Sequence, residues 1–197
     1  MTGPSSASLW ALAQQARGFA LPFYAQPERA YHNAAHVRDL LLALGTRGVL
    51  NPELALAVWG HDLIYDPQAS DNEARSADEF DRWLTAQGAP EGLRTQVRTL
   101  ILVTRHVAAP EGRDAALLAD ADLAILGAKP AHFANYDAAI RREYAHVPEC
   151  RYRQGRLGVL RQFLARERLF ATPEFEALEH QARQNLRAAI SALEGAS

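Results

Sequence analysis

Apolar residues recur every three or four positions along almost the whole sequence, and stretches that alternate apolar and polar residues are nearly absent. An amphipathic helix has a period of about 3.6 residues, whereas a half-buried strand has a period of about 2. Ala, Leu, Arg and Glu, which are strong helix formers, are abundant. The sequence therefore predicts an all-α fold, a bundle of roughly seven to nine helices.

Residues typical of helix starts divide this periodic pattern into separate helices. Asn51 and Thr172 each precede a proline that suits the first helical position, and Ser70 with Glu73 has the spacing of a capping box. Because the connections are short, we expect a single domain over residues 1–197. The predicted helices cover residues 5–20, 32–45, 52–64, 71–87, 91–107, 113–126, 130–146, 152–169 and 173–194.

Composition excludes several classes of protein. The 21 Lys and Arg residues nearly balance the 23 Asp and Glu residues, so the chain has no global basic field for a nucleic acid polymer. The single cysteine, Cys150, cannot form an internal disulfide, which favours a reducing compartment, and we expect a cytoplasmic protein. No apolar run approaches the roughly 20 residues that span a bilayer, so no membrane partner is expected.

Two histidines four residues apart, His32 and His36, form the first candidate site. On a helix this spacing places both side chains on one face, where they can act as two ligands or as a ligand and a proton donor. The second candidate is His61-Asp62 at the end of an apolar run. A buried aspartate needs compensation, which a divalent cation can supply, but a surface position at a helix end is equally consistent with the pattern.

Two carboxylates, Asp120 and Asp122, interrupt the apolar segment 117–126. Because residues two apart face about 200° away from each other on a helix, one of them can line a site while the other caps a helix, pairs with Arg or meets solvent. His106, at the end of another apolar helix, offers one more imidazole.

The order of these residues along the chain resembles the pattern of the HD superfamily of metal-dependent phosphohydrolases. The matching residues are His36, His61-Asp62 and Asp122. The Tyr31-His32-Asn33 string that precedes His36 is also similar to the signature of class I cyclic-nucleotide phosphodiesterases, in which the first histidine is the general acid and the second a metal ligand. The phosphodiesterases' large nucleotide-binding region does not fit in 197 residues, so their substrate does not carry over.

A closer resemblance is to a small bacterial branch of predicted HD phosphohydrolases. It shares Tyr-His-Asn, His-Asp-x-x-Tyr, Asp-Asn-Glu, Asp-Ala-Asp-Leu-Ala-Ile-Leu-Gly and Ile-Arg-x-Glu-Tyr, over roughly residues 30–170. The resemblance implies one HD-type helical domain. The predicted helix 173–194 either packs on this domain or serves a homodimer.

The resemblance implies hydrolysis of a phosphoester or phosphoanhydride of a small molecule, nucleotides included. One or two divalent ions would be held by His36, His61, Asp62 and Asp122, while His32 would protonate the leaving oxygen. Mixed nitrogen and oxygen ligands suit Mn, Fe, Co, Ni or Zn, with Mg an option at a second site.

Further candidates surround this core. Glu73 either orients the reacting water or serves only the capping box. The predicted substrate contacts are Asn33, His106, Arg141 and Tyr144; for His106 and Arg141 the alternatives are a hydrogen-bonded histidine at a helix end and a solvated charged face.

Two rival functions use the same residues. One is a di-iron oxygenase like the myo-inositol oxygenase relatives of the HD fold, which needs further histidine ligands; His106 is well placed, whereas His132 and His146 lie beyond Asp122. The other is a non-catalytic module that binds a metal or a nucleotide. The oxygenase predicts tightly bound iron, and the module predicts binding without turnover.

Overall fold

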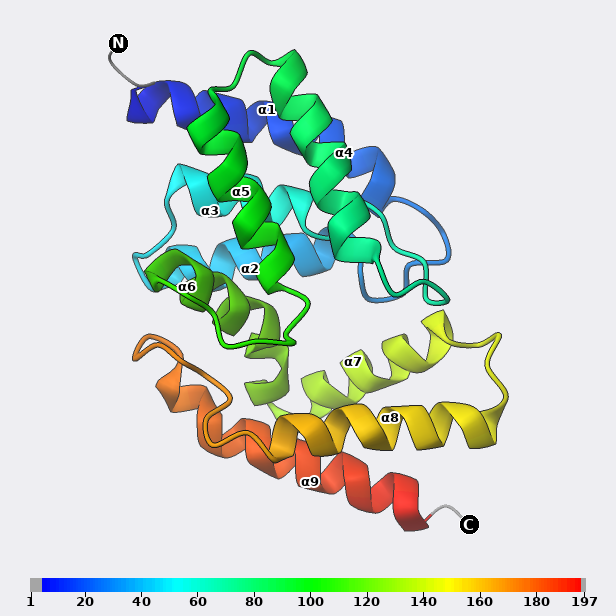
Figure 1. Cartoon of the computed structure of the whole chain (residues 1–197). Helices are drawn as coiled ribbons and strands as arrows, with labels where there is room; N and C mark the ends of the chain where they lie inside the picture. The colour runs from blue at the N-terminus through cyan, green and yellow to red at the C-terminus, as the bar shows by residue number, and fades with distance from the viewer. Residues whose placement is uncertain (1–4, 196–197) are drawn as a thin grey trace. The chain divides into compact units, whose positions relative to one another are not determined.

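The computed structural model describes residues 5–195, and within them the fold is all-α, with no strand (Figure 1). Every predicted helix has a counterpart. The nine α-helices of the described residues are α1 (Ser6–Tyr24), α2 (Ala34–Thr46), α3 (Pro52–Gly60), α4 (Asn72–Ala86), α5 (Glu91–Val103), α6 (Arg113–Leu123), α7 (Pro130–Glu143), α8 (Glu149–Leu164) and α9 (Glu179–Gly195). Two short 3₁₀ helices, η1 (Ala124–Gly127) and η2 (Glu176–Leu178), complete the regular structure.

The chain divides into two compact units, the first ending at Ala119 and the second beginning at Asp120. In the first unit α3 is the central helix: α1, α2, α4 and α5 all pack against it. All of its residues except Glu53 are buried. Its start is as predicted, with Pro52 in the first turn and the Asn51 side chain accepting a hydrogen bond from the Leu54 N–H.

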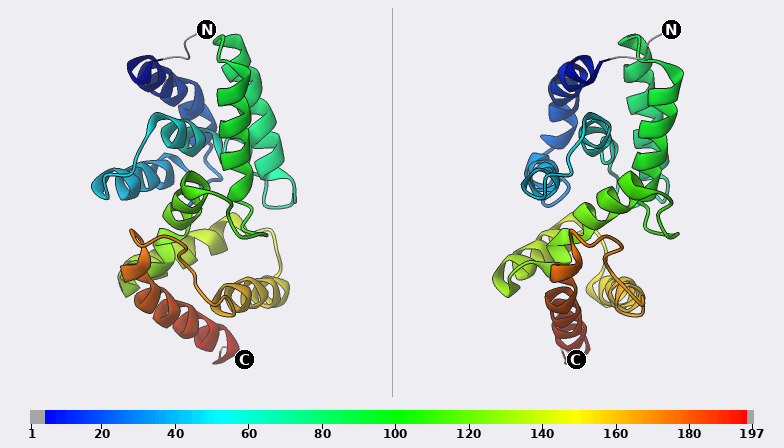
Figure 2. Two further views of the ribbon diagram at one scale, coloured as in Figure 1. Left: turned by 60° about the vertical axis from the view of Figure 1, so that its left-hand side comes forward. Right: turned by 90° about the vertical axis from the view of Figure 1, so that its left-hand side faces the viewer.

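Helices α4 and α5 form an antiparallel pair beside α3, which the two views of Figure 2 show from different sides. The predicted capping box at the start of α4 is wrong. The residue before the helix is Asp71, whose side chain makes no capping hydrogen bond. The Asn72 side chain instead binds the backbone N–H and carbonyl of Asp66, which ties the start of α4 to the preceding loop.

The second unit contains η1, η2, α7, α8 and α9, and α9 packs against both α8 and η1. Asn185 of α9 donates two hydrogen bonds from Nδ2, to the carbonyls of Leu126 and Ala128. Buried Arg156 of α8 binds Asp137 of α7 at 2.7 Å. These polar contacts fix the helices of this unit to one another.

The last helix begins later than predicted. The Thr172 hydroxyl does not cap a helix at Pro173, because it donates to a carboxylate oxygen of Asp120 at 2.6 Å. The chain then turns, and α9 starts only at Glu179.

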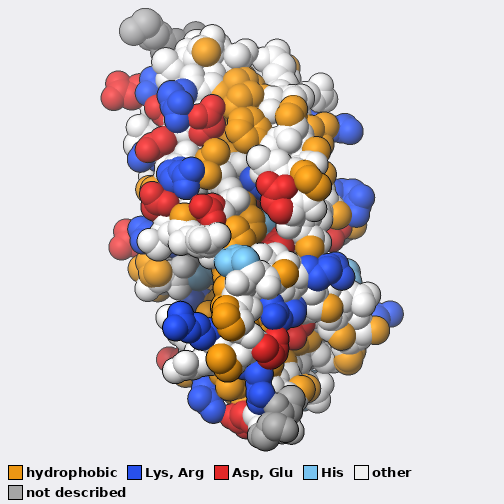
Figure 3. Space-filling view, turned by 90° about the vertical axis from the view of Figure 1, so that its right-hand side faces the viewer, with side chains coloured by type: hydrophobic (Ala, Val, Ile, Leu, Met, Phe, Trp, Pro, Cys, Tyr) orange, Lys and Arg blue, Asp and Glu red, His pale blue; other side chains and the backbone are white. Residues whose placement is uncertain are grey.

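Acidic and basic side chains are interspersed on the face shown in Figure 3, as expected from their nearly equal numbers. Within residues 5–195, no helix combines the length and the apolar character needed to cross a membrane.

Candidate metal centre

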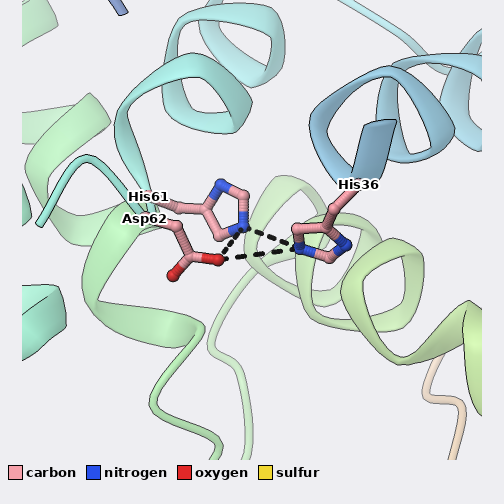
Figure 4. Close-up of side chains that lie close together, drawn as sticks. All are labelled: His36, His61 and Asp62. Atoms are coloured by element: carbon pink, nitrogen blue, oxygen red, sulfur yellow. Dashed lines mark hydrogen bonds and ion pairs between the residues drawn. The ribbon is translucent and has the colours of Figure 1, made fainter. Parts of the chain in front are cut away.

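Three side chains of the first unit point toward one another: His36, His61 and Asp62 (Figure 4). The Nε2 atom of His61 lies 3.1 Å from Nε2 of His36 and 3.1 Å from Oδ2 of Asp62, and His36 Nε2 lies 3.7 Å from the same oxygen. The histidine side chains are 1–2% exposed, whereas that of Asp62 is 13% exposed. The cluster therefore combines two buried imidazoles with a carboxylate that solvent can reach.

His36 lies in the first turn of α2, and the turn before the helix determines its place. The Asn33 side chain accepts a hydrogen bond from the Ala35 N–H and donates to the carbonyls of Arg29 and Ala30. Asn33 thus caps α2 and joins it to the preceding segment. This contact is compatible with the predicted role of Asn33 beside a substrate, which stays a prediction.

His61 and Asp62 follow α3 rather than lying on it, because the helix ends at Gly60. A Cβ atom at Gly60 would lie 2.7 Å from ring carbons of Phe80 and 2.8 Å from Cδ1 of Ile101. Neighbouring residues on a helix diverge by about 100°. His61 follows the helix as its C-terminal capping residue and keeps helical torsion angles (φ −69°, ψ −38°). Its Nε2 atom nevertheless lies 3.1 Å from Oδ2 of Asp62, so these two adjacent side chains reach one point.

The backbone orients the His61 ring. Its Nδ1 atom lies 2.9 Å from the Val58 carbonyl oxygen, which can only accept, so Nδ1 carries the proton in this arrangement. The other ring nitrogen, Nε2, then presents its lone pair to the cluster. Metal-binding histidines are commonly held in this way by a hydrogen bond from their second nitrogen.

Burial raises the pKa of the Asp62 carboxyl, but the rings, when protonated, lower it well below its usual range: His61 by charge and by hydrogen bonding, and His32 and His36 by charge. Asp62 is therefore ionised at neutral pH. When His61 carries its proton on Nδ1 alone, Asp62 Oδ2 and His61 Nε2 offer lone pairs to the same point. Acceptor atoms this close repel one another unless a proton or a cation lies between them.

The spacing of the three atoms fits a metal ion. Tetrahedral ligands at about 2.0–2.1 Å from zinc lie about 3.3 Å apart, and neighbouring octahedral ligands at about 2.1 Å lie about 3.0 Å apart. The observed separations of 3.1, 3.1 and 3.7 Å lie close to these values. The donor set and its geometry therefore fit a divalent transition ion.

His32 lies outside α2, in the turn before Asn33, so the prediction that it occupies the same helix as His36 is wrong. The Asn33 cap starts the helix two residues later than the predicted helix 32–45. The two rings are nevertheless close, with centroids 5.8 Å apart, and the His32 ring stacks on Tyr65 at 4.2 Å. His32 is thus beside the cluster and held by an aromatic side chain.

The two aspartates of α6 differ. Asp120 is 2% exposed and accepts hydrogen bonds from the N–H groups of Ala171 and Thr172 and from the Thr172 hydroxyl. Asp122 is half-buried and, like Asp120, belongs to the second unit. Asp120 has a structural role, as one of the pair was expected to have, and Asp122 as a further metal ligand stays a prediction.

Two other predicted site residues lie at the ends of helices in the first unit. Glu73 is half-buried in the first turn of α4. His106 is half-buried just after α5, and its φ of 54° is the one positive value among the non-glycine residues that the structure describes. Their catalytic and substrate-binding roles stay predictions.

Arg141 and Tyr144 lie at the end of α7 in the second unit. The Arg141 guanidinium binds Glu149 at 3.0 Å and the Tyr144 carbonyl at 2.7 Å, and it lies 4.5 Å from the centre of the Tyr152 ring. These contacts hold together the end of α7, the connecting segment and the start of α8. The prediction that Arg141 and Tyr144 bind substrate stays a prediction.

Sequence reasoning missed three residues that hold the segment after α3. The Tyr24 hydroxyl donates to the Trp59 carbonyl and accepts from the Asp62 N–H, and the Ser76 hydroxyl binds both backbone groups of Ile64. Arg29 donates to the carbonyl of Asp62. These contacts involve backbone atoms of distant residues, and the sequence contains no local signal for them.

Comparison of the chain with protein-family models, with curated proteins and with solved structures finds no match.

Proposed function

We propose that this protein is a metal-dependent phosphohydrolase that cleaves a phosphoester or phosphoanhydride of a small molecule. The observation that carries the proposal is the convergence of two imidazole nitrogens and one carboxylate oxygen within 3.1–3.7 Å of one another. The resemblance of these residues and of His32 to the HD pattern supports the choice of phosphoryl chemistry.

In this proposal His36, His61 and Asp62 hold a divalent ion, with Mn, Fe, Co, Ni or Zn best suited to the mixed nitrogen and oxygen ligands. A bound ion of this kind lowers the pKa of a coordinated water and polarises a phosphoryl oxygen. The Val58 carbonyl keeps the proton of His61 on Nδ1, so that Nε2 stays available as a ligand. The partial exposure of Asp62 leaves an approach for the substrate.

His32 is the proposed proton donor. Its ring lies next to that of His36 without belonging to the cluster of ligand atoms, and Tyr65 restricts its orientation. A protonated ring nitrogen of His32 would transfer its proton to the leaving oxygen. General-acid catalysis of this kind contributes about 10²- to 10⁴-fold to a rate.

The test combines metal content with turnover in protein purified without chelator or nickel resin. Hydrolysis of p-nitrophenyl phosphate and bis(p-nitrophenyl) phosphate, and release of phosphate or pyrophosphate from nucleotides, are measured with each metal. We expect His61→Ala to lose both metal and turnover. His32→Ala should keep the metal and lose about 10²-fold or more in rate.

His180→Ala is the matched control, because His180 is an exposed histidine of α9. The His180→Ala protein should retain both its metal and its turnover. A wild-type protein that takes up none of Mn, Fe, Co, Ni or Zn on titration would contradict the metal centre. A protein that binds metal but releases no phosphate from any of these substrates would contradict the hydrolase.

A further inference from the structure

A buried arginine lies in the connection between α1 and α2. Arg29 is 4% exposed. Its Nε donates to Gln26 Oε1 at 2.8 Å, one terminal nitrogen donates to the carbonyls of His32 at 3.2 Å and Asp62 at 2.6 Å, and the other donates to the Leu63 carbonyl at 2.7 Å. One side chain therefore binds both segments that carry the candidate chemistry.

Neither of those segments is helical. His32 precedes α2, while Asp62 and Leu63 follow α3, so no helical hydrogen bonds determine their backbone positions. The segments are about 30 residues apart in the sequence. The guanidinium fork is rigid, its donors point in fixed directions, and it donates to both segments.

Two aromatic rings confine the guanidinium. Its central carbon lies 5.4 Å from the centre of the Tyr24 ring and 5.7 Å from that of Tyr65. Tyr65 also stacks on the His32 ring. The orientation of Arg29 is thereby linked to the orientation of the proposed proton donor as well as to the backbone of a proposed ligand.

Charge does not account for this arrangement. A guanidinium stays protonated in proteins, and a positive charge weakens the binding of a nearby divalent cation. Any favourable effect of Arg29 on the metal centre must therefore come from the geometry that it imposes.

We propose that Arg29 is a positioning residue, whose guanidinium holds the His32 turn and the Asp62–Leu63 turn at the separation that the metal ligands require. The inference rests on the proposed metal centre. It predicts that the shape of the Arg29 side chain, rather than its charge, determines metal affinity.

Arg29→Lys is the decisive variant, because it keeps the charge and loses the fork. Affinity for Co²⁺ is measured by competition with a chelator, and the visible absorption of bound Co²⁺ reports the ligand geometry. We expect the dissociation constant to rise roughly 10- to 100-fold, the range for partners that orient metal ligands, and the spectrum to change. In Arg29→Ala, low concentrations of guanidinium should restore part of the affinity.

Arg94→Lys is the matched control: Arg94 also binds through Nε and a terminal nitrogen, to Asp81 on the pair of helices α4 and α5. It should leave the dissociation constant and the spectrum unchanged. Circular dichroism shows whether each variant is folded. Should both Arg29 variants be unfolded, Gln26→Met decides, because it removes one acceptor of the guanidinium and should weaken Co²⁺ binding several-fold.

The outcomes separate the two proposals. Wild-type affinity and spectrum in folded Arg29→Lys, or in Gln26→Met when it is the deciding variant, would overturn the positioning role and leave the metal centre in place. Absence of Co²⁺ binding by the wild-type protein would overturn the metal centre itself.

Discussion

Asp62 and Asp120 are both aspartates withdrawn from solvent, one in each unit, yet their surroundings are opposite. Asp120 accepts hydrogen bonds on both oxygens from backbone and hydroxyl donors of residues 171–172. Oδ2 of Asp62 faces His61 Nε2, which presents a lone pair when Nδ1 is protonated. Burial raises the pKa of both carboxyls. The pKa of Asp120 stays above its usual value despite its hydrogen bonds, whereas the imidazoles, when protonated, bring that of Asp62 below it.

The comparison separates a structural carboxylate from a candidate ligand. A carboxylate with N–H and O–H donors on both of its oxygens, as Asp120 has, is already compensated for its burial and needs no ion. A carboxylate among ring nitrogens still requires a cation or a proton. Burial alone therefore does not identify a functional aspartate, and the partners do.

The largest expected effect is on metal content. Asp62→Ala should lose the bound ion and keep its helical circular dichroism, because Asp62 lies outside the helices. Asp39→Ala, at an aspartate 52% exposed, is the control and should keep the ion. Elemental analysis of the purified proteins measures both, and an Asp62→Ala protein that retains the wild-type amount of metal would remove the distinction drawn above.

Asp120→Ala should show the converse behaviour. It leaves three donors without their acceptor, two of them on buried Thr172, and we expect the free energy of unfolding to fall by about 3 kcal/mol. Urea denaturation measures this change. The folded variant should hold as much metal as wild type, so a specific loss of metal with unchanged stability would reverse the assigned roles.

Two glycines extend the comparison to packing. A Cβ atom at Gly60 would contact Phe80 and Ile101, and one at Gly127 would lie 2.6 Å from Cβ of Leu178. Each Gly→Ala variant should lose about 1–3 kcal/mol in free energy of unfolding, as overpacked cores do. Only Gly60→Ala should also weaken Co²⁺ binding, because Gly60 directly precedes His61. Equal affinities for Co²⁺ in the two variants would show that packing at α3 does not affect the proposed ligands.

The smallest effect concerns Asp81, a partly exposed carboxylate with an Arg partner. Its hydrogen bonds with Arg94 lower its pKa although burial opposes this, so the contact stabilises the fold above the unfolded pKa near 3.8. This stability is lost as the pH falls through the folded pKa. Asp81→Asn should be slightly less stable than wild type at pH 7, and the difference should shrink as the pH falls below 3.8. A difference independent of pH in urea denaturation would exclude this ionic origin.

Helical periodicity was sufficient to predict every helix, but it could not locate several of the helix ends, the end of α3 beside the candidate ligands among them. The predicted range 52–64 extended past Gly60 because the apolar run continues to Leu63 and Ile64. The start of α9 depends on the hydrogen bond between Asp120 and Thr172, which are 52 residues apart. Local patterns contain no information on contacts at that distance.

Residue type and order singled out His36, His61 and Asp62, and the structure brings these side chains together. The hydrogen bonds of Arg29 to the two segments could not be predicted, since their acceptors there are the backbone carbonyls of His32, Asp62 and Leu63, and every residue has a carbonyl. Nothing in the sequence distinguishes Arg29 from the other arginines of the chain.

The unequal exposure of the three proposed ligands also bears on the kinetics of metal exchange. With both imidazoles 1–2% exposed and the carboxylate 13% exposed, an ion that entered the proposed site would meet Asp62 first, and a departing ion would leave it last. A carboxylate can bind an ion that still holds water molecules, so the hydration shell of the ion can be replaced stepwise. Uptake and release of the ion would then both depend on the Asp62 carboxylate. The rate at which a chelator removes the ion would be limited by its dissociation from this carboxylate.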